Sequence, residues 1–209
     1  NWIVNKPYQE RIYDRTGAVL LKKTHYYYDA MPYGSMGNDG DLSETREWIN
    51  PITYKLHQYV YNSFGNLVQE TDDNAHVTSY QYDSSHRYVT TRTNALGQNT
   101  VYTYDSGTGN LLTEVDPNAY TTTYTYDIFG RPSKVIKEYD TIANPTVQYT
   151  YSFDGFAPET IQRKEKEISG FGNLYQTFET YDGFGKSLQK RRESTTSNQQ
   201  ITTSIQILT

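Results

Sequence analysis

The residues with the richest chemistry are spread along this chain and form none of the common catalytic motifs. No pair of histidines has the His-x-x-x-His or His-Glu-x-x-His spacing of a zinc site; the histidines are His25, His57, His76 and His86. No Gly-x-Ser-x-Gly nucleophile elbow is present, and no glycine-rich loop followed by lysine would hold a phosphate. The sequence therefore predicts no catalytic residue, no cofactor-binding residue, no metal ligand and hence no cofactor.

Two carboxylate pairs come nearest to a glycosidase site. Glycosidases place two carboxyl groups about 5 to 10 Å apart on either side of the bond they cleave. Glu44 with Glu47, or Asp72 with Asp73, could do so if the fold brought them to that separation. The simpler interpretation is that they are turn residues and solvated charges, and we predict that the chain is not an enzyme.

Two segments depart from the rest of the sequence. Residues 31–51 are rich in Gly and Asp and predict a long connecting loop or insertion. Asn38, Asp39, Asp41 and Glu44 supply the hard oxygens that calcium prefers, so a cation loop is the alternative, although their spacing is not that of an EF-hand. The mixed charges of residues 159–167 predict a solvated strand or loop, with a partner-docking edge as the alternative.

The composition indicates which elements position these residues. Of the 209 residues only 35% are hydrophobic, yet 15% are aromatic and 22 are Tyr, which disfavours both a broad aliphatic core and disorder. Tyr and Thr favour half-buried β-sheets. The net charge of -5 disfavours a nucleic-acid partner, and no apolar run is long enough to span a membrane. The absence of cysteine excludes disulfides and does not by itself decide the compartment.

An internal repeat dominates the chain. The pattern Tyr-x-Tyr-Asn/Asp places its second Tyr at positions 61, 82, 104 and 126, a period of 21 or 22 residues. Looser copies occur around Tyr13, Tyr28, Tyr151 and Tyr181. The clearest repeats span residues 59–137, and residues 138–209 read as degenerate repeats of one segment covering 1–209.

Each repeat predicts two strands and two turns. The strands that follow the Tyr pairs are expected at residues 66–71, 88–93 and 111–115. In Tyr-x-Tyr both rings point to one face, because side chains alternate along a strand. In Asp127-Ile128-Phe129-Gly130, Asp takes the first turn position and Gly the fourth, where a positive φ is tolerated. Asn94-Ala95-Leu96-Gly97 has the same form, and Asp116-Pro117 is explained by turn chemistry. The fold class is therefore all-β, an antiparallel β-meander.

The repeat resembles the YD repeat of the Rhs family. The residues that carry the resemblance are the Tyr-Asp-x-x-Gly turns and the Thr-x-Tyr-x-Tyr-Asp strands, most clearly from Tyr59 to Lys137. The family includes bacterial Rhs polymorphic toxins, the B and C subunits of Tc toxin complexes and, more distantly, the animal teneurins. The stretches around Pro7–Asp14 and Tyr181–Lys186 are similar to the B-type toxin subunits.

The resemblance implies a fold and a function. In the toxins, such repeats form a curved or spiralling sheet that closes into a hollow shell around a cytotoxic C-terminal polypeptide. For this chain it implies a segment of a secreted, non-catalytic shell. Its implied partners are neighbouring YD repeats of the same or another chain, the enclosed polypeptide and a translocation subunit or cell-surface glycan. Because rows of Tyr with nearby Asn, Asp and Gln can stack on sugars, an extracellular carbohydrate-binding or adhesin sheet is the alternative.

The residues on which this interpretation depends are structural. They are the repeated tyrosines and the Asp and Gly residues of the turns. The set comprises Tyr59, Tyr61, Tyr80, Tyr82, Asp83, Tyr102, Tyr104, Asp105, Tyr124, Tyr126, Asp127, Gly65, Gly97, Gly130, Tyr181, Asp182 and Gly185.

Overall fold

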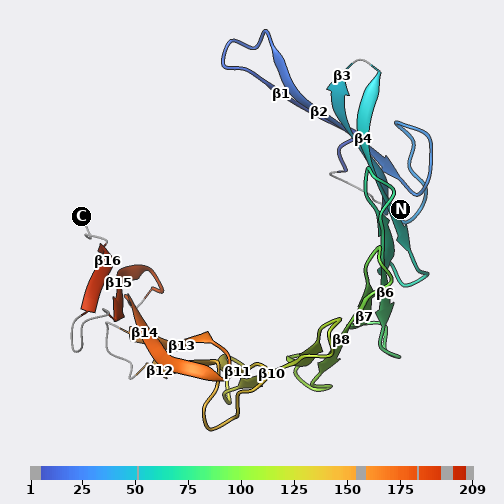
Figure 1. Ribbon diagram of the computed structural model, residues 1–209. Coiled ribbons are helices and arrows are strands. Elements are labelled where there is room, and N and C mark those ends of the chain that lie inside the picture. Colours follow the sequence, from blue (N-terminus) through green and yellow to red (C-terminus); the bar gives the residue numbers. More distant parts are fainter. Residues whose placement is uncertain (1–5, 51, 154–158, 183, 194–199, 206–209) are drawn as a thin grey trace. The chain divides into compact units, whose positions relative to one another are not determined.

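The computed structural model describes residues 6–50, 52–153, 159–182, 184–193 and 200–205 (Figure 1). Sixteen strands and no helix occur among these residues. The described part of the chain accordingly contains no helix that is long and apolar enough to cross a membrane. The sequence predicted one segment, and the structure divides into two compact units, Asn1–Val101 and Tyr102–Thr209.

Each unit is an antiparallel sheet in which the strands follow one another in chain order. The first unit holds β1 (Gln9–Tyr13), β2 (Leu20–Tyr28), β3 (Leu42–Asn50), β4 (Thr53–Tyr61), β5 (Leu67–Thr71), β6 (Val77–Tyr82) and β7 (Val89–Thr93). Strand β8 (Asn99–Tyr104) lies at the division. The second unit holds β9 (Leu111–Val115), β10 (Thr121–Tyr126), β11 (Pro132–Ile136), β12 (Val147–Ser152), β13 (Glu159–Ile168), β14 (Phe171–Tyr181), β15 (Ser187–Glu193) and β16 (Gln200–Ile205). The predicted all-β meander is confirmed.

The predicted strands of the clearest repeats agree closely with the structure. We expected strands at residues 66–71, 88–93 and 111–115, and β5, β7 and β9 begin at Leu67, Val89 and Leu111. The agreement arises because turns that begin with Asx bracket each strand, and those turns are local in sequence.

Residues 31–51 are not one long loop. Strand β3 occupies Leu42–Asn50, and Thr45 pairs with Tyr26 on one side and His57 on the other. The loop interpretation was wrong for this half because β3 lacks the Tyr-x-Tyr signature, and pairing on both sides outweighs its charged composition. Only residues 29–41 connect β2 to β3; Pro51 lies outside the described residues.

The mixed-charge run also lies inside the sheet. Strand β13 covers it and pairs with β12 through Arg163 and Tyr149, and with β14 through Arg163 and Thr177. A docking edge is therefore the wrong interpretation, because neither side of this strand is unpaired.

Few side chains are fully buried. Among the described residues the buried apolar side chains are Tyr28 and Val147, together with Pro145. Without a thick apolar core, strand pairing and side-chain hydrogen bonds carry a large share of the stability.

A repeated irregularity marks the strands that carry tyrosine. In six strand pairs the register shifts at the Tyr that precedes an Asp or Asn turn; these residues are Tyr13, Tyr28, Tyr61, Tyr82, Tyr126 and Tyr181. Such a bulge bends the strand and increases its local twist. The sequence analysis did not predict these bulges.

Candidate functional site

The repeated turns are built by Asp or Asn at their first position. At the β10–β11 turn the N–H of Asp127 donates to the Arg131 carbonyl, 2.9 Å away, and Oδ1 of Asp127 accepts from the N–H groups of Phe129 and Arg131 at 2.9 and 3.0 Å. The same two side-chain contacts recur at Asn62, Asp72, Asn94, Asp116 and Asp182. One side chain thus fixes each turn.

Two predicted aspartates hold turns of different length. Asp83 accepts from the N–H groups of Arg87 and Tyr88 at 2.7 and 3.0 Å, and Asp105 accepts from Gly107 and Thr108 at 3.1 and 2.7 Å. These contacts stabilise the ionised carboxylate. The N–H of Thr108, followed by its hydroxyl, lowers the pKa of Asp105, and the hydroxyl of Ser85 is the largest cause that lowers the pKa of Asp83.

The predicted glycines adopt the left-handed backbone conformation. The φ angles are 78° at Gly65, 76° at Gly97, 76° at Gly130 and 80° at Gly185. The sequence prediction of positive φ at these turn positions is confirmed.

The hydroxyl of the second Tyr of the motif bonds a backbone carbonyl of the neighbouring strand, beyond the last paired residues of the two strands. The pairing of β5 with β6 stops at Gln69 and Ser79, and the hydroxyl of Tyr82 donates to the Leu67 carbonyl beyond it, at 2.8 Å. The same contact recurs from Tyr126 to Leu111 at 2.9 Å, from Tyr28 to Pro7 at 2.9 Å and from Tyr151 to Pro132 at 2.8 Å. Each phenol therefore pairs a backbone acceptor that the ladder leaves unpaired.

The first Tyr of the motif binds a glutamate on the preceding strand. Tyr80 donates to Glu70 at 2.6 Å and Tyr124 to Glu114 at 3.1 Å. Tyr26 donates to Glu10 at 3.1 Å. Burial, followed by the hydrogen bond to Glu114, raises the pKa of Tyr124 to about 12, so this phenol stays protonated and remains a donor. Sequence reasoning missed the glutamates, although their recurrence at 70 and 114, ten residues before a Tyr, is a signal that could have found them.

The other predicted tyrosines lie on β4, β8 and β14. Tyr61 pairs across the sheet with Leu67, as Tyr82 does with Val89. Tyr59, Tyr102, Tyr104 and Tyr181 are half-buried on β4, β8 and β14. Burial raises the pKa of Tyr61, Tyr104 and Tyr181.

The histidines lie apart from one another. Within the first unit, His25 lies between the rings of Tyr33 and Tyr54, and His86 stacks on Phe64 with ring centroids 3.8 Å apart. His57 is a strand residue of β4, and His76 contacts Asp72 in the β5–β6 turn. Nothing in these positions brings two imidazoles together.

The carboxylate pairs do not face one another. Glu44 and Glu47 are three residues apart on β3 and so lie on opposite faces, Glu44 with Arg46 and Glu47 with Lys22. Asp72 and Asp73 bond their own turn, to His76 and Asn74 respectively. Glu44 and Glu47 therefore do not form a glycosidase pair, and the carboxylates of Asp72 and Asp73 are engaged within their own turn.

The loop that supplies Asn38, Asp39 and Asp41 makes hydrogen bonds to a carboxylate of the protein itself. The carboxylate of Asp29 accepts from the N–H groups of Gly40 and Asp41 at 3.0 and 2.7 Å. Burial, and then the nearby Asp29 and Asp39, raise the pKa of Asp41. Within the described ranges no group of three or more His, Asp or Glu is placed to hold a metal ion.

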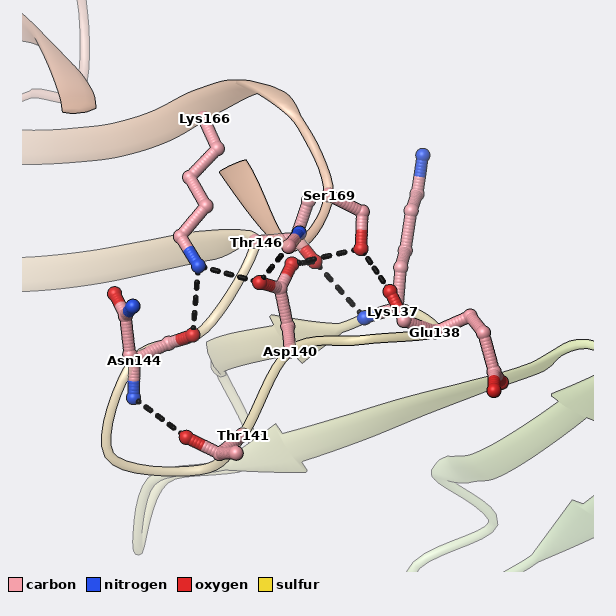
Figure 2. A network of polar contacts seen from close by, with 9 residues as sticks. Lys137, Glu138, Asp140, Thr141, Asn144, Thr146, Lys166 and Ser169 are labelled. Carbon is pink, nitrogen blue, oxygen red and sulfur yellow. Dashed lines mark hydrogen bonds and ion pairs between the residues drawn. The ribbon is translucent and has the colours of Figure 1, made fainter. Parts of the chain in front are cut away.

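One polar cluster was not predicted at all. Figure 2 shows Asp140, in the β11–β12 loop, contacting Lys166 of β13, and the two side chains are 0% and 2% exposed. The carboxylate also accepts from the hydroxyls of Thr146 and Ser169, at 2.5 and 2.9 Å, and from the N–H of Gly170 at 2.9 Å. We call Asp140, Thr146, Lys166, Ser169 and Gly170 the Asp140 clasp.

The clasp is a closed ion pair and not a reactive centre. Burial alone would raise the pKa of Asp140, but the ammonium of Lys166 and the hydroxyl of Thr146 outweigh it and hold the pKa at about 2. Lys166 also donates to the Asn144 carbonyl at 3.0 Å. Every oxygen of the carboxylate is occupied by protein donors, so a substrate has no access. The partners are 26 residues apart, and no local sequence pattern indicates the contact.

Comparison with known proteins identifies the repeat. The model of the RHS Repeat family matches residues 61–98 and 104–142. No curated protein matches the chain.

Solved structures similar to the chain include complexes of TcdB2 with TccC3 and a Tc holotoxin pore. A crystal structure of TcdB2-TccC3-Cdc42 matches with 13% identity and a TM-score of 0.44, over 93% of this chain and 13% of that chain. A crystal structure of TcdB2-TccC3 matches with 15% identity and a TM-score of 0.39, over 91% and 12%. The Tc holotoxin pore of Photorhabdus luminescens, with a substitution in TccC3, matches with 16% identity and a TM-score of 0.42, over 93% and 14%.

The present chain thus spans only about an eighth of the length of these solved chains. The firm identification is that of the repeat. Residues 61–98 and 104–142, which hold part of the tyrosine and Asx network, match the RHS Repeat family.

Proposed function

We propose that this chain is a non-catalytic wall segment of a secreted toxin-like shell, which encloses a polypeptide cargo until delivery. The observation that carries the proposal is the recurrence of the same internal contacts along the sheet. Second-position phenols bond a backbone carbonyl at Tyr28, Tyr82, Tyr126 and Tyr151, and first-position phenols bond a Glu at Tyr26, Tyr80 and Tyr124. Asx side chains fix the repeated turns. Side chains that hydrogen-bond within their own sheet support a structural scaffold and are not available to bind a ligand.

Containment follows from such a sheet when it is continued by further repeats. A wall needs strands that pair on both sides, because an unpaired edge exposes backbone groups to the cargo. The strands between β1 and β16 meet this requirement, because they pair in chain order. The mechanism is steric: the wall separates an unfolded or partly folded polypeptide from proteases and from aggregation.

The structure gives less support to the carbohydrate-binding alternative. That hypothesis needed Tyr rows whose rings and hydroxyls are available to a sugar. The hydroxyls of Tyr82 and Tyr126 are instead bonded to backbone oxygens, and that of Tyr124 to Glu114.

Protease protection of the natural chain that contains this segment tests the proposal. If the repeats enclose a cargo, the cargo region resists a protease added to the native protein and is digested at once after mild denaturation. Digestion of the repeats after denaturation is the internal control that shows the protease to be active. Equal digestion of the cargo region before and after opening would refute containment.

A further inference from the structure

Two exposed tyrosines of the second unit lie with their rings close together. Tyr120, in the β9–β10 turn, and Tyr139, in the β11–β12 loop, are 48% and 73% exposed. Their ring centroids are 6.4 Å apart, and the ring planes are inclined at 60°. Strands β10 and β11 separate the two residues in the sequence, so the fold and not the local chain brings the rings together.

The hydroxyl ends of these two rings face each other. A hydrogen bond between the two side chains, followed by their electrostatic interaction, raises the pKa of Tyr139. Because the ordinary pKa of a phenol is about 10, Tyr139 is protonated at neutral pH. The ring carbons next to each hydroxyl, the ortho carbons, therefore lie at the facing ends of the two rings. These are the carbons at which oxidation can join two phenols.

The Asp140 clasp holds the backbone under Tyr139. Asp140 directly follows Tyr139, and its buried carboxylate contacts Lys166 of β13 and the N–H of Gly170. Tyr139 has a φ of 68°, a conformation that side chains other than Gly rarely adopt. A Cβ at Gly170 would lie 2.8 Å from the Cβ of Tyr139, so the β13–β14 turn packs closely against this residue. Such strain persists only where the surroundings impose it, and here it keeps Tyr139 beside Tyr120.

Other neighbouring tyrosines are less accessible. In the ring pair of Tyr8 and Tyr28, whose centroids are 6.1 Å apart, Tyr28 is buried. In the pair of Tyr149 and Tyr151 both residues are half-buried, and their rings stack with an interplanar angle of 17°. An oxidant dissolved in water therefore reaches both rings more readily at the exposed pair of the β9–β10 turn and the β11–β12 loop.

We propose that Tyr120 and Tyr139 form an oxidative cross-linking site, at which a haem peroxidase supplied with hydrogen peroxide joins the two rings as dityrosine. Each phenol loses one electron and its hydroxyl proton and becomes a phenoxyl radical, whose unpaired electron is shared with the ortho carbons. One ortho carbon of each ring then forms a C–C bond, and the hydrogen on each of these carbons moves through solvent to the phenolic oxygen. One hydrogen peroxide takes up the two electrons and two protons and is reduced to two molecules of water.

The cross-link would connect two connecting segments of a chain that has no cysteine and so no disulfide. It joins the β9–β10 turn to the β11–β12 loop and closes the chain around β10 and β11. A covalent link of this kind lowers the conformational entropy of the unfolded chain, as a disulfide does, and thereby stabilises the folded sheet. The site does not depend on enclosure of a cargo, and the protease experiment above can fail without affecting it.

Treatment of the purified chain with a haem peroxidase and hydrogen peroxide, at low protein concentration, tests the site. The monomer fraction is expected to show dityrosine fluorescence and a mass that is lower by two hydrogen atoms. Trypsin should then release residues 93–134 covalently joined to residues 138–163. Fragmentation of this product in a mass spectrometer should place the link at Tyr120 and Tyr139.

Three variants show whether the fold selects this pair. Tyr120→Phe and Tyr139→Phe each remove one phenol and keep the ring. Dityrosine in the monomer should fall about tenfold in either variant, because coupling is efficient only between groups that the fold holds together. Tyr175→Phe removes a phenol that is 47% exposed on β14, and this matched control should react like the parent. Circular dichroism confirms that each variant is folded.

Thermal unfolding of the cross-linked monomer measures the consequence of the link. Its midpoint is expected to lie above that of the untreated parent, whereas treated and untreated Tyr139→Phe should unfold at the same temperature. A parent monomer without dityrosine, a link between other tyrosines, or a Tyr139→Phe variant that reacts like the parent would each overturn the proposal. A cross-linked monomer with an unchanged midpoint would also overturn it.

Discussion

The hydroxyl of Tyr82 donates a hydrogen bond to the backbone oxygen of Leu67, 2.8 Å away on the neighbouring strand. The ladder between β5 and β6 has already ended at Gln69 and Ser79, so the phenol replaces the missing strand partner. The same relationship joins Tyr126 to Leu111, and both residues lie 44 positions later in the sequence than Tyr82 and Leu67. At these two tyrosines a side chain thus performs a task that the backbone cannot complete where the strands separate.

Removing this hydroxyl should weaken the sheet without altering its shape. For Tyr82→Phe and Tyr126→Phe we expect each change to lower the free energy of unfolding by about 1 kcal/mol, since a half-buried carbonyl loses its donor. Urea unfolding followed by circular dichroism measures this difference. Tyr13→Phe, at an exposed Tyr, is the matched control and should change stability little. Equal stability of all three variants would show that the phenol contact contributes nothing.

The turn glycines can be tested in both directions. A Cβ at Gly97 would meet no atom within 4 Å, so Gly97→Ala adds only the strain of its φ of 76° and should destabilise by about 1 kcal/mol. Ala119 has a φ of 66° at the corresponding position of the β9–β10 turn. The reverse change, Ala119→Gly, should therefore raise the midpoint of thermal unfolding. A fall in that midpoint would contradict the assignment of backbone strain to this turn.

The Asp140 clasp predicts a large and non-additive pair of effects. Lys166→Met leaves a buried carboxylate without its cation and should cost about 3 to 5 kcal/mol of unfolding free energy. Adding Asp140→Asn should restore part of that loss, because an amide needs no counter-ion. A double-mutant cycle in urea measures the coupling. Additive losses would mean that the two groups do not interact in the folded protein.

Acid should weaken the turns. Hydrogen bonds lower the pKa of Asp72, led by the N–H of His76, and that of Asp105, led by the N–H of Thr108. A carboxylate whose pKa is lower in the folded state stabilises the fold above its unfolded pKa of about 3.9, and this stabilisation is lost as pH falls through the folded value. Thermal midpoints should therefore stay level above about pH 5 and fall below about pH 4.

A substitution separates this titration from other acid effects. Asn62 and Asn94 make the same turn contacts without a charge, so Asp72→Asn should keep the turn and reduce the dependence of the thermal midpoint on pH. A pH profile that is identical in the variant and the parent would exclude Asp72 as a source.

The sequence alone determined the elements that are local. Asx at the first turn position brackets the strands of the clearest repeats, with Gly at the fourth position of the turns that end at Gly65, Gly97 and Gly130. An Asx side chain reaches only the N–H groups of its own turn. The Tyr-x-Tyr period then predicted two-strand units and the antiparallel meander. This is also why the positive φ values of Gly65, Gly97 and Gly130 could be predicted, since a turn is specified by four or five neighbouring residues.

Tertiary structure decided what depends on residues far apart in the chain. Strand β3 forms within residues 31–51 because β2 and β4 pair with it on both sides, which its own composition does not indicate. The partners of the phenols, such as Leu67 for Tyr82, depend on a register set by bulges. Lys166 looks like one charge among many in residues 159–167, yet it is buried against Asp140, because the fold brings the β11–β12 loop onto β13. Local hydrogen bonding fixed the repeat, and strand pairing between distant residues fixed the clasp.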